Sequence, residues 1–164
     1  MKVLVLYFSM GGRTEKVAKY IASELEDQVD QIQMERLEYH GKVMELMRKQ
    51  ETIRKGDLSN FSYNKEIEDL SQYDLILFGS PTYGAIPAPV FNGILQHIKN
   101  LEGRDVIIFA TCRFYGGKIL QMMEHDIEKK GGNIIAKKLF KGFFRIKMLK
   151  ARNFGQELTK MIKN

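Results

Sequence analysis

The stretch Ser9–Thr14, SMGGRT, places two hydroxyl residues and two adjacent glycines directly after an apolar run and directly before an amphipathic one. Glycines allow a tight turn in which backbone N–H groups point inward, and Ser9 and Thr14 add hydroxyl donors. A helix that begins here adds the positive end of its dipole, which favours a bound anion. The sequence therefore predicts a phosphate-binding loop. Its candidate residues are Ser9, Met10, Gly11, Gly12, Arg13 and Thr14.

An alternative interpretation of this loop is that Ser9 or Thr14 only caps the helix, for which one hydroxyl group is sufficient. That interpretation leaves the adjacent Gly11 and Gly12 unexplained. The loop lacks the lysine of the GxxxxGK[ST] motif and does not match GxGxxG. Nucleoside-triphosphate and dinucleotide binding are therefore not favoured.

Two further segments combine aromatic side chains with glycines. In SPTYGA, Tyr83 precedes Gly84, and in TCRFYGGK, Phe114 and Tyr115 precede Gly116. An aromatic side chain beside a conformationally free backbone can line a slot for a planar ring. The alternatives are a proline-stiffened loop with an incidental tyrosine, and a Phe114 that packs in the core. The candidate residues are Pro81, Thr82, Tyr83, Gly84, Thr111, Cys112, Arg113, Phe114, Tyr115 and Gly116.

The hydrophobic pattern predicts the elements that must position these segments. Short apolar runs indicate strands, and apolar residues that recur on one face indicate helices. The predicted strands are Val3–Phe8, Val29–Leu37, Asp74–Gly79, Asp105–Thr111 and Asn133–Phe140. The predicted helices are Thr14–Leu25, Gly41–Lys55, a short turn at Glu66–Gln72, residues 90–99, Lys118–Lys130 and Lys150–Lys163. Irregular segments are expected at Gly56–Asn64, Pro81–Pro89 and Lys141–Lys147.

Strands that alternate with helices favour right-handed crossovers and a parallel sheet covered on both faces. We expect one α/β domain over residues 1–164, with a doubly wound, five-stranded parallel sheet in the order 2-1-3-4-5. In this order, ligands bind beyond the carboxyl ends of the strands, between strands 1 and 3. The three loops are therefore expected to meet at one edge of the sheet and to bind a mononucleotide, with its phosphate on Ser9–Thr14.

The sequence resembles the flavodoxin family, which binds FMN noncovalently. The stretch VLYFSMGGRTEKVAKYI carries the Ser-x-x-Gly-x-Thr core of the family's first loop, and YDLILFGSPTYG and the FYGG loop fall where its ring-binding loops fall. The resemblance implies that Ser9–Thr14 holds the phosphate of FMN. It implies that Tyr83 and Tyr115 stack on the two faces of the ring, with Phe114 as the substitute for Tyr115. Gly84 resembles the family glycine whose peptide turns over on reduction, so that its carbonyl accepts a hydrogen bond from the flavin.

The resemblance also implies a function. It predicts an electron carrier in which FMN performs the chemistry and the protein passes electrons between redox partner proteins. The alternative is an enzyme of the same fold, an NAD(P)H-dependent quinone or flavin reductase. For Tyr39–Asn64 the alternatives are a lid over the ring, an oligomerisation segment and, favoured over both, a second helix with a long exit loop. A phosphorylatable receiver domain is not expected, because Phe8–Ser9–Met10 and Gly79–Ser80–Pro81 stand where that chemistry needs acidic residues.

The charge of the chain is unevenly distributed. Residues 137–164 contain nine Lys or Arg residues and one acidic residue, Glu157. We expect acidic redox partners to dock near this basic region, and the alternative is a solvated face of the last strand and helix. No nucleic-acid motif accompanies these charges, so nucleic acid is not an expected partner.

Ala85 and Ile86 stand where family members often carry acidic residues after the glycine, and Arg113 is expected near the ring. Negative charge near the flavin disfavours its anionic reduced form and lowers its potential. We therefore expect a reduction potential less negative than that of acidic relatives.

Cys112 is the only cysteine, and the three histidines form no metal-binding motif, so neither a disulfide within the chain nor a metal site is expected. The sequence gives no candidate for a catalytic residue. The N-terminal apolar run is too short for a signal peptide, and no stretch approaches the ~20 apolar residues of a membrane span. We expect a cytoplasmic protein.

Overall fold

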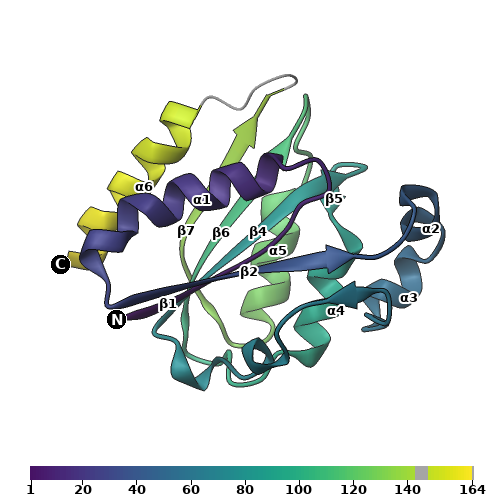
Figure 1. The fold of residues 1–164 in the computed structure, drawn as a ribbon, viewed down its shortest axis with the longest axis horizontal. Coiled ribbons are helices and arrows are strands. Elements are labelled where there is room, and N and C mark those ends of the chain that lie inside the picture. The colour runs from purple at the N-terminus through teal and green to yellow at the C-terminus, as the bar shows by residue number, and fades with distance from the viewer. Residues whose placement is uncertain (143–147, 164) are drawn as a thin grey trace.

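A twisted sheet forms the centre of the computed structural model, which describes residues 1–142 and 148–163 (Figure 1). The strands are β1 (Lys2–Phe8), β2 (Gln31–Tyr39), β3 (Phe61–Ser62), β4 (Leu75–Tyr83), β5 (Ile86–Pro87), β6 (Asp105–Cys112) and β7 (Asn133–Lys141). The helices are α1 (Arg13–Leu25), α2 (Val43–Arg48), α3 (Gln50–Arg54), α4 (Pro89–His97), α5 (Ile119–Glu128) and α6 (Met148–Lys163). Short 3-10 turns lie at Glu26–Gln28, Lys65–Glu68 and Leu70–Gln72.

Five parallel strands lie in the order β2-β1-β4-β6-β7. This is the predicted order 2-1-3-4-5, and the doubly wound α/β fold is confirmed. The described sheet has seven strands rather than five. The two additional strands are short and antiparallel, because β3 pairs with the end of β2 and β5 pairs with the end of β4.

The residues of β1 show why helices cover both faces of the sheet. Every residue from Val3 to Phe8 is buried, and successive side chains point to opposite faces. Val3, Val5 and Tyr7 belong to the core layer shared with α1 and α6, while Leu4, Leu6 and Phe8 belong to the layer shared with α4 and α5. Figure 1 shows α1 and α6 side by side on one face of the sheet. A strand that is apolar on both faces is therefore placed at the centre.

The predicted helix Gly41–Lys55 is in fact two short helices. The helical geometry breaks at Lys49, between α2 and α3, where φ and ψ are −94° and 9°. This break lets α3 pack against α4 so closely that a Cβ on Gly93 would lie 2.3 Å from the carbonyl oxygen of Ile53. The following segment Gly56–Asn64, predicted to be irregular, contains β3.

The predicted connection Lys141–Lys147 lies mostly outside the described residues, and Lys141 itself is the last residue of β7. Helix α6 begins at Met148, before the predicted start at Lys150. Its buried side chains Ala151, Phe154 and Leu158 join the core layer of α1. This packing fixes α1, and with it the position of the loop that precedes α1.

Candidate functional site

The segment Ser9–Thr14 connects β1 to α1 at the carboxyl edge of the sheet. Gly12 has a φ of 77°, a left-handed conformation that glycine adopts without steric cost. Helix α1 begins at Arg13, and no side chain caps it. The alternative in which Ser9 or Thr14 serves as the cap is therefore wrong. The N–H groups of the first turn have no acceptor within the helix, which suits them to an anion.

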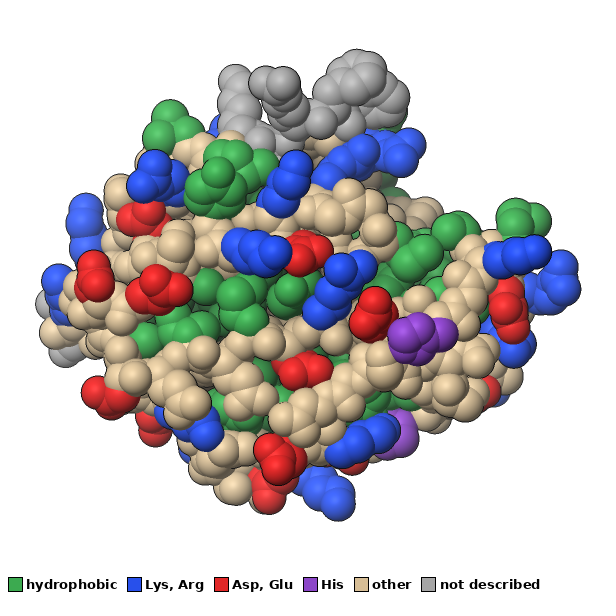
Figure 2. All heavy atoms as spheres, viewed as in Figure 1, with side chains coloured by type: hydrophobic (Ala, Val, Ile, Leu, Met, Phe, Trp, Pro, Cys, Tyr) green, Lys and Arg blue, Asp and Glu red, His purple; other side chains and the backbone are tan. Residues whose placement is uncertain are grey.

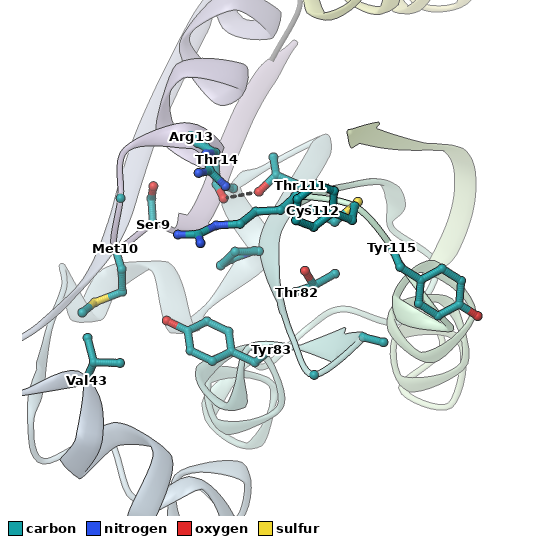
Figure 3. Close-up of a pocket in the computed structure, with 16 residues that line it drawn as sticks. Ser9, Met10, Arg13, Thr14, Val43, Thr82, Tyr83, Thr111, Cys112 and Tyr115 are labelled. Atoms are coloured by element: carbon teal, nitrogen blue, oxygen red, sulfur yellow. Dashed lines mark hydrogen bonds between the residues drawn. The ribbon is translucent and has the colours of Figure 1, made fainter. Parts of the chain in front are cut away.

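Thr14 connects the predicted phosphate-binding segment Ser9–Thr14, named the phosphate loop below, to the loop that follows β6. Its hydroxyl lies 2.8 Å from the hydroxyl of Thr111, and both side chains are buried (Figure 3). Ser9, at the start of the phosphate loop, is also buried. The hydroxyl pair fixes two of the three predicted loops to each other, although Thr14 and Thr111 are 97 positions apart in the sequence.

Arg36 on β2 contacts the first residue of the phosphate loop and the residue that directly follows the loop. Its Nη2 donates a hydrogen bond of 2.9 Å to the carbonyl oxygen of Ser9, and its Nη1 lies 3.2 Å from Oε2 of Glu15. Glu15 also pairs with Lys19 at 2.7 Å. The hydrogen bond from Lys19 and the charges of Lys19 and Arg36 lower the pKa of Glu15. Sequence reasoning did not select Arg36, although the pairing of strands 1 and 2 places it beside Tyr7.

Strand β4 continues through Tyr83 and forms a hairpin with β5, so the prediction that Pro81–Pro89 is irregular was wrong. Gly84 and Ala85 at the tip have φ values of 60° and 67°, as a two-residue type I′ turn requires. The second value is unfavourable for alanine, so the sequence alone does not suggest this turn. Two contacts support it. The N–H of Lys118 donates to the carbonyl of Ala85 at 3.2 Å, and a Cβ on Gly117 would lie 2.3 Å from that of Ala85.

Arg54 on α3 holds the other strand of this hairpin. Its Nη2 donates to the carbonyl of Pro87 at 3.0 Å, and its Nη1 donates to the side-chain oxygen of Asn92. Asn92 in turn donates to Asp126 at 2.6 Å. The helical segment that contains α2 and α3 is thus attached to the hairpin and to α4 and α5.

The three loops border a cavity of about 810 Å³ at the carboxyl edge of the sheet (Figure 3). Every candidate residue predicted from the sequence lines it except Gly12 and Gly116. Gly12 forms the turn before α1, and Gly116 packs on Leu139, which a Cβ would approach to 2.5 Å. Two residues that were not predicted, Val43 of α2 and Ala85, also line the cavity.

The aromatic side chains at the cavity differ in how firmly they are held. Tyr83 is half-buried, packs on Phe8 with 6.3 Å between ring centroids, and has a pKa raised by burial. Phe114 and Tyr115 are 71% and 74% exposed, so the alternative in which Phe114 packs in the core is wrong. Figure 3 shows Tyr83 beneath the cavity and Tyr115 at its far side, with the Tyr115 ring directed outward.

Cys112 lines the cavity as a buried thiol, and its burial raises its pKa, so it is protonated at neutral pH.

Among residues 1–142 and 148–163, no group of three or more His, Cys, Asp or Glu side chains is arranged to hold a metal ion. No helix in the same described ranges combines the length and the apolar character that crossing a bilayer demands.

Comparison with known proteins matches residues 2–163 to the flavodoxin family. The chain belongs to this family. Its fold is similar to that of a Lactobacillus acidophilus flavoprotein in complex with FMN, with 23% identity, a TM-score of 0.62, and coverage of 84% of this chain and 92% of that chain. It is also similar to oxidised flavodoxin 2 from Bacillus cereus, with 18% identity, a TM-score of 0.64 and full coverage of both chains. A flavodoxin from the domain Archaea gives 17% identity, a TM-score of 0.59 and full coverage of both. No curated protein sequence matches the chain.

The cavity suits the cofactor of a flavodoxin in size and in chemistry. Ligand pockets commonly measure roughly 300–1,000 Å³, a range that includes this one. A Cβ added at Gly11, Gly12 or Gly84 would meet nothing within 4 Å, so open space lies beside the backbone of both the phosphate loop and the hairpin tip. Arg13 and Arg113 border the cavity and add positive charge for an anionic group.

Proposed function

We propose that the chain is a cytoplasmic electron carrier that binds FMN as one domain over residues 1–164 and passes electrons between redox partner proteins. One observation carries this proposal: a cavity at the carboxyl edge of the sheet brings the phosphate loop together with two loops that carry aromatic residues and glycines. Membership of the flavodoxin family supports FMN as the ligand. The bound flavin supplies the redox chemistry, and the protein binds it, orients it and controls access to it.

Different residues of the cavity are proposed to contact different parts of FMN. The backbone N–H groups of the phosphate loop and the hydroxyls of Ser9 and Thr14 hold the phosphate, aided by the positive end of α1. Tyr83 lies against one face of the ring, and Tyr115, or Phe114 in its place, lies against the other. Gly84, at the tip of the hairpin, has the backbone freedom to turn its carbonyl toward the flavin.

We further propose that acidic redox proteins dock near the basic region 137–164. Lys141 is exposed and is paired in the sheet with Cys112, a residue of the cavity, so its charge lies at the edge nearest the ring. Farther from this edge the basic charges are partly compensated, because Lys137 pairs with Glu124 at 2.6 Å and Arg152 with Glu24 at 3.0 Å. Figure 2 shows that basic and acidic side chains are interspersed over the face formed by α1, α6 and β2. Docking is therefore expected at the cavity end of the region.

The alternative function, an NAD(P)H-dependent quinone or flavin reductase, is favoured by one feature. Val43 of α2 lines the cavity, and Met44 beside it is 72% exposed. An apolar surface beside the ring is suited to an apolar second substrate. Because α2 belongs to the segment for which a lid was one alternative, both functions need an experimental test.

Anaerobic spectroscopy separates the two functions. The purified protein is mixed with FMN, and binding is followed by the quenching of flavin fluorescence. NADPH alone is then added. We expect slow bleaching of the flavin with NADPH and fast bleaching when an electron-transferring reductase is included. Rapid bleaching by NADPH alone would support the enzyme. A preparation that stays colourless with excess FMN and quenches none of its fluorescence would contradict both.

A further inference from the structure

Arg36 does not line the cavity, yet it contacts the first residue of the phosphate loop and the residue that directly follows the loop. It lies on β2 beside Tyr7 of β1, and its guanidinium reaches past the end of β1. One nitrogen donates to the Ser9 carbonyl at 2.9 Å, where the loop begins. Another lies 3.2 Å from the Glu15 carboxylate, in the first turn of α1. One side chain of the neighbouring strand therefore fixes the separation between the start and the end of the loop.

The third guanidinium nitrogen of Arg36, Nε, takes no part in these contacts. The Nε of Arg36 is buried and has no hydrogen-bond partner among the described residues. A buried donor without an acceptor lowers the stability of the folded protein. The hydrogen bonds of the two Nη atoms therefore hold the side chain at the loop.

The contact with Glu15 has an electrostatic consequence for an anionic ligand. A carboxylate in the first turn of α1 stabilises the helix, but it repels a phosphate bound at the same helix end. Arg36 and Lys19 both pair with Glu15, at 3.2 Å and 2.7 Å, and offset its charge. Loss of Arg36 would loosen the loop at Ser9 and would also expose the phosphate to a less compensated carboxylate.

We propose that Arg36 is a positioning residue that shapes the phosphate loop and thereby sets the preference of this protein for FMN over riboflavin, which lacks the phosphate. The inference rests on the proposed binding of FMN. Arg36 acts through Ser9 and Glu15, and among the described residues its hydrogen bonds go to these two and not to the loops that carry Tyr83 and Tyr115. Its removal should therefore weaken binding of the phosphate and leave binding of the ring unchanged.

The test compares FMN and riboflavin titrations of the apoprotein, followed by flavin fluorescence. In Arg36→Gln we expect the Kd for FMN to rise by about tenfold or more, as for loss of a charge-assisted contact, and the Kd for riboflavin to change by less than about twofold. Arg104→Gln is the matched control. Arg104 also donates to two backbone carbonyls, those of Tyr73 at 2.9 Å and Ser71 at 3.2 Å, but at a distance from the cavity. It should lower the melting temperature and leave both Kd values unchanged.

A second variant separates positioning from charge. Arg36→Lys keeps the positive charge, but a single ammonium group does not reproduce the forked pair of contacts. We expect the Kd for FMN to rise by about three- to fivefold, again without a change for riboflavin. This variant also carries the test if Arg36→Gln fails to fold. Full recovery of FMN binding by lysine would overturn the positioning role and leave only a charge effect.

The other outcomes are equally decisive. Equal weakening of FMN and riboflavin in Arg36→Gln would make Arg36 a structural residue and overturn the proposal, as would no change in either Kd. Failure of the proposed function is recognised separately, because the unmodified protein would then not bind FMN at all or would not prefer it over riboflavin.

Discussion

The two halves of the cavity are built differently. The phosphate loop is held by buried groups: Ser9 and Thr14 are 2% and 1% exposed, and Thr14 is bonded to Thr111. The loop after β6 carries Phe114 and Tyr115, which are more than 70% exposed. The half that is proposed to receive the anion is therefore formed before the ligand arrives, whereas the half for the ring is partly open.

This difference follows from the chemistry of the two ligand parts. An anion needs several N–H and O–H groups fixed in one geometry, and such preorganisation reduces the entropic cost of binding. A flat apolar ring makes less directional contacts, so exposed side chains can close on it when it binds. The comparison predicts that substitutions in the first half act selectively on FMN, while substitutions in the second half act on FMN and riboflavin alike.

The largest effect is expected from removal of the firmly held aromatic side chain. Tyr83→Ala should raise the Kd for both flavins by about 30-fold, or about 2 kcal/mol, because it removes a ring that packs on Phe8 and faces the cavity. Tyr115→Ala should raise them by only about threefold, because that side chain gives up its exposed conformations on binding. Fluorescence titration measures both. A larger loss for Tyr115 than for Tyr83 would show that the open side supplies most of the binding free energy.

Two adjacent glycines test the phosphate half. A Cβ added at Gly11 or at Gly12 would meet no atom within 4 Å, but only Gly12 has a positive φ, 77°. Gly12→Ala should raise the Kd for FMN by about five- to tenfold, since a left-handed alanine costs about 1 kcal/mol, and should spare riboflavin. Gly11→Ala is the control and should change the Kd little. Similar effects at both positions would mean that free space, and not the backbone conformation, matters in this loop.

The ring half can be tested through its charge. Ala85→Asp places a carboxylate beside the ring at a φ of 67°, a conformation that Asp and Asn tolerate. It should lower the potential of the couple that forms the anionic reduced flavin by about 20–40 mV, or up to about 1 kcal/mol. Ala85→Asn is the neutral control, and redox titration is the measurement. An equal shift in both variants would assign the change to the turn and not to the charge.

The smallest effect concerns the pH dependence of stability near the phosphate half. The pKa of Glu15 lies below its usual value of 4.5, so its ion pairs stabilise the fold above that pH and lose this contribution as the pH falls through the lowered pKa. Glu15→Gln should cost about 0.5 kcal/mol of unfolding free energy at pH 7 and progressively less as the pH falls through the lowered pKa of Glu15. Urea titrations measure both. Glu45→Gln, which breaks only the pair with Lys49, is the control and should cost less. A cost for Glu15→Gln that does not decrease as the pH falls would show that its charge is not the cause.

The central sheet and the loops at its carboxyl edge could be predicted from the sequence, because they depend on the pattern of apolar residues along the chain. The uninterrupted apolar run Val3–Phe8 requires burial on both faces, which places it at the centre of a parallel sheet. The alternation of strands and helices then indicates the strand order. In a parallel sheet of that order, the loops after strands 1, 3 and 4 must lie at the same edge, beyond the carboxyl ends of the strands. The candidate residues were found in this way, and all but Gly12 and Gly116 line the cavity.

The parts that sequence did not predict depend on contacts between distant residues. The hairpin tip at Gly84–Ala85 is held by Gly117 and Lys118, and Ala85 would not favour its conformation without them. Val43 lines the cavity from α2, the first of two short helices where the sequence indicated one longer helix. Arg36 is one charged residue among many until the pairing of β1 with β2 places it beside the phosphate loop. No local pattern marks any of these three.

The contacts of Arg54 have a consequence for protein engineering. Through Pro87 and Asn92, this side chain joins residues 43–54 to the hairpin and to the helices behind it. Replacing the β4–β5 hairpin with one from a relative could change the position of the Pro87 carbonyl. The half-buried guanidinium of Arg54 would then lose its acceptor. Residues 43–54 and the hairpin should therefore be exchanged together. A chimaera that takes both segments from one protein should be more stable than a chimaera that takes them from two.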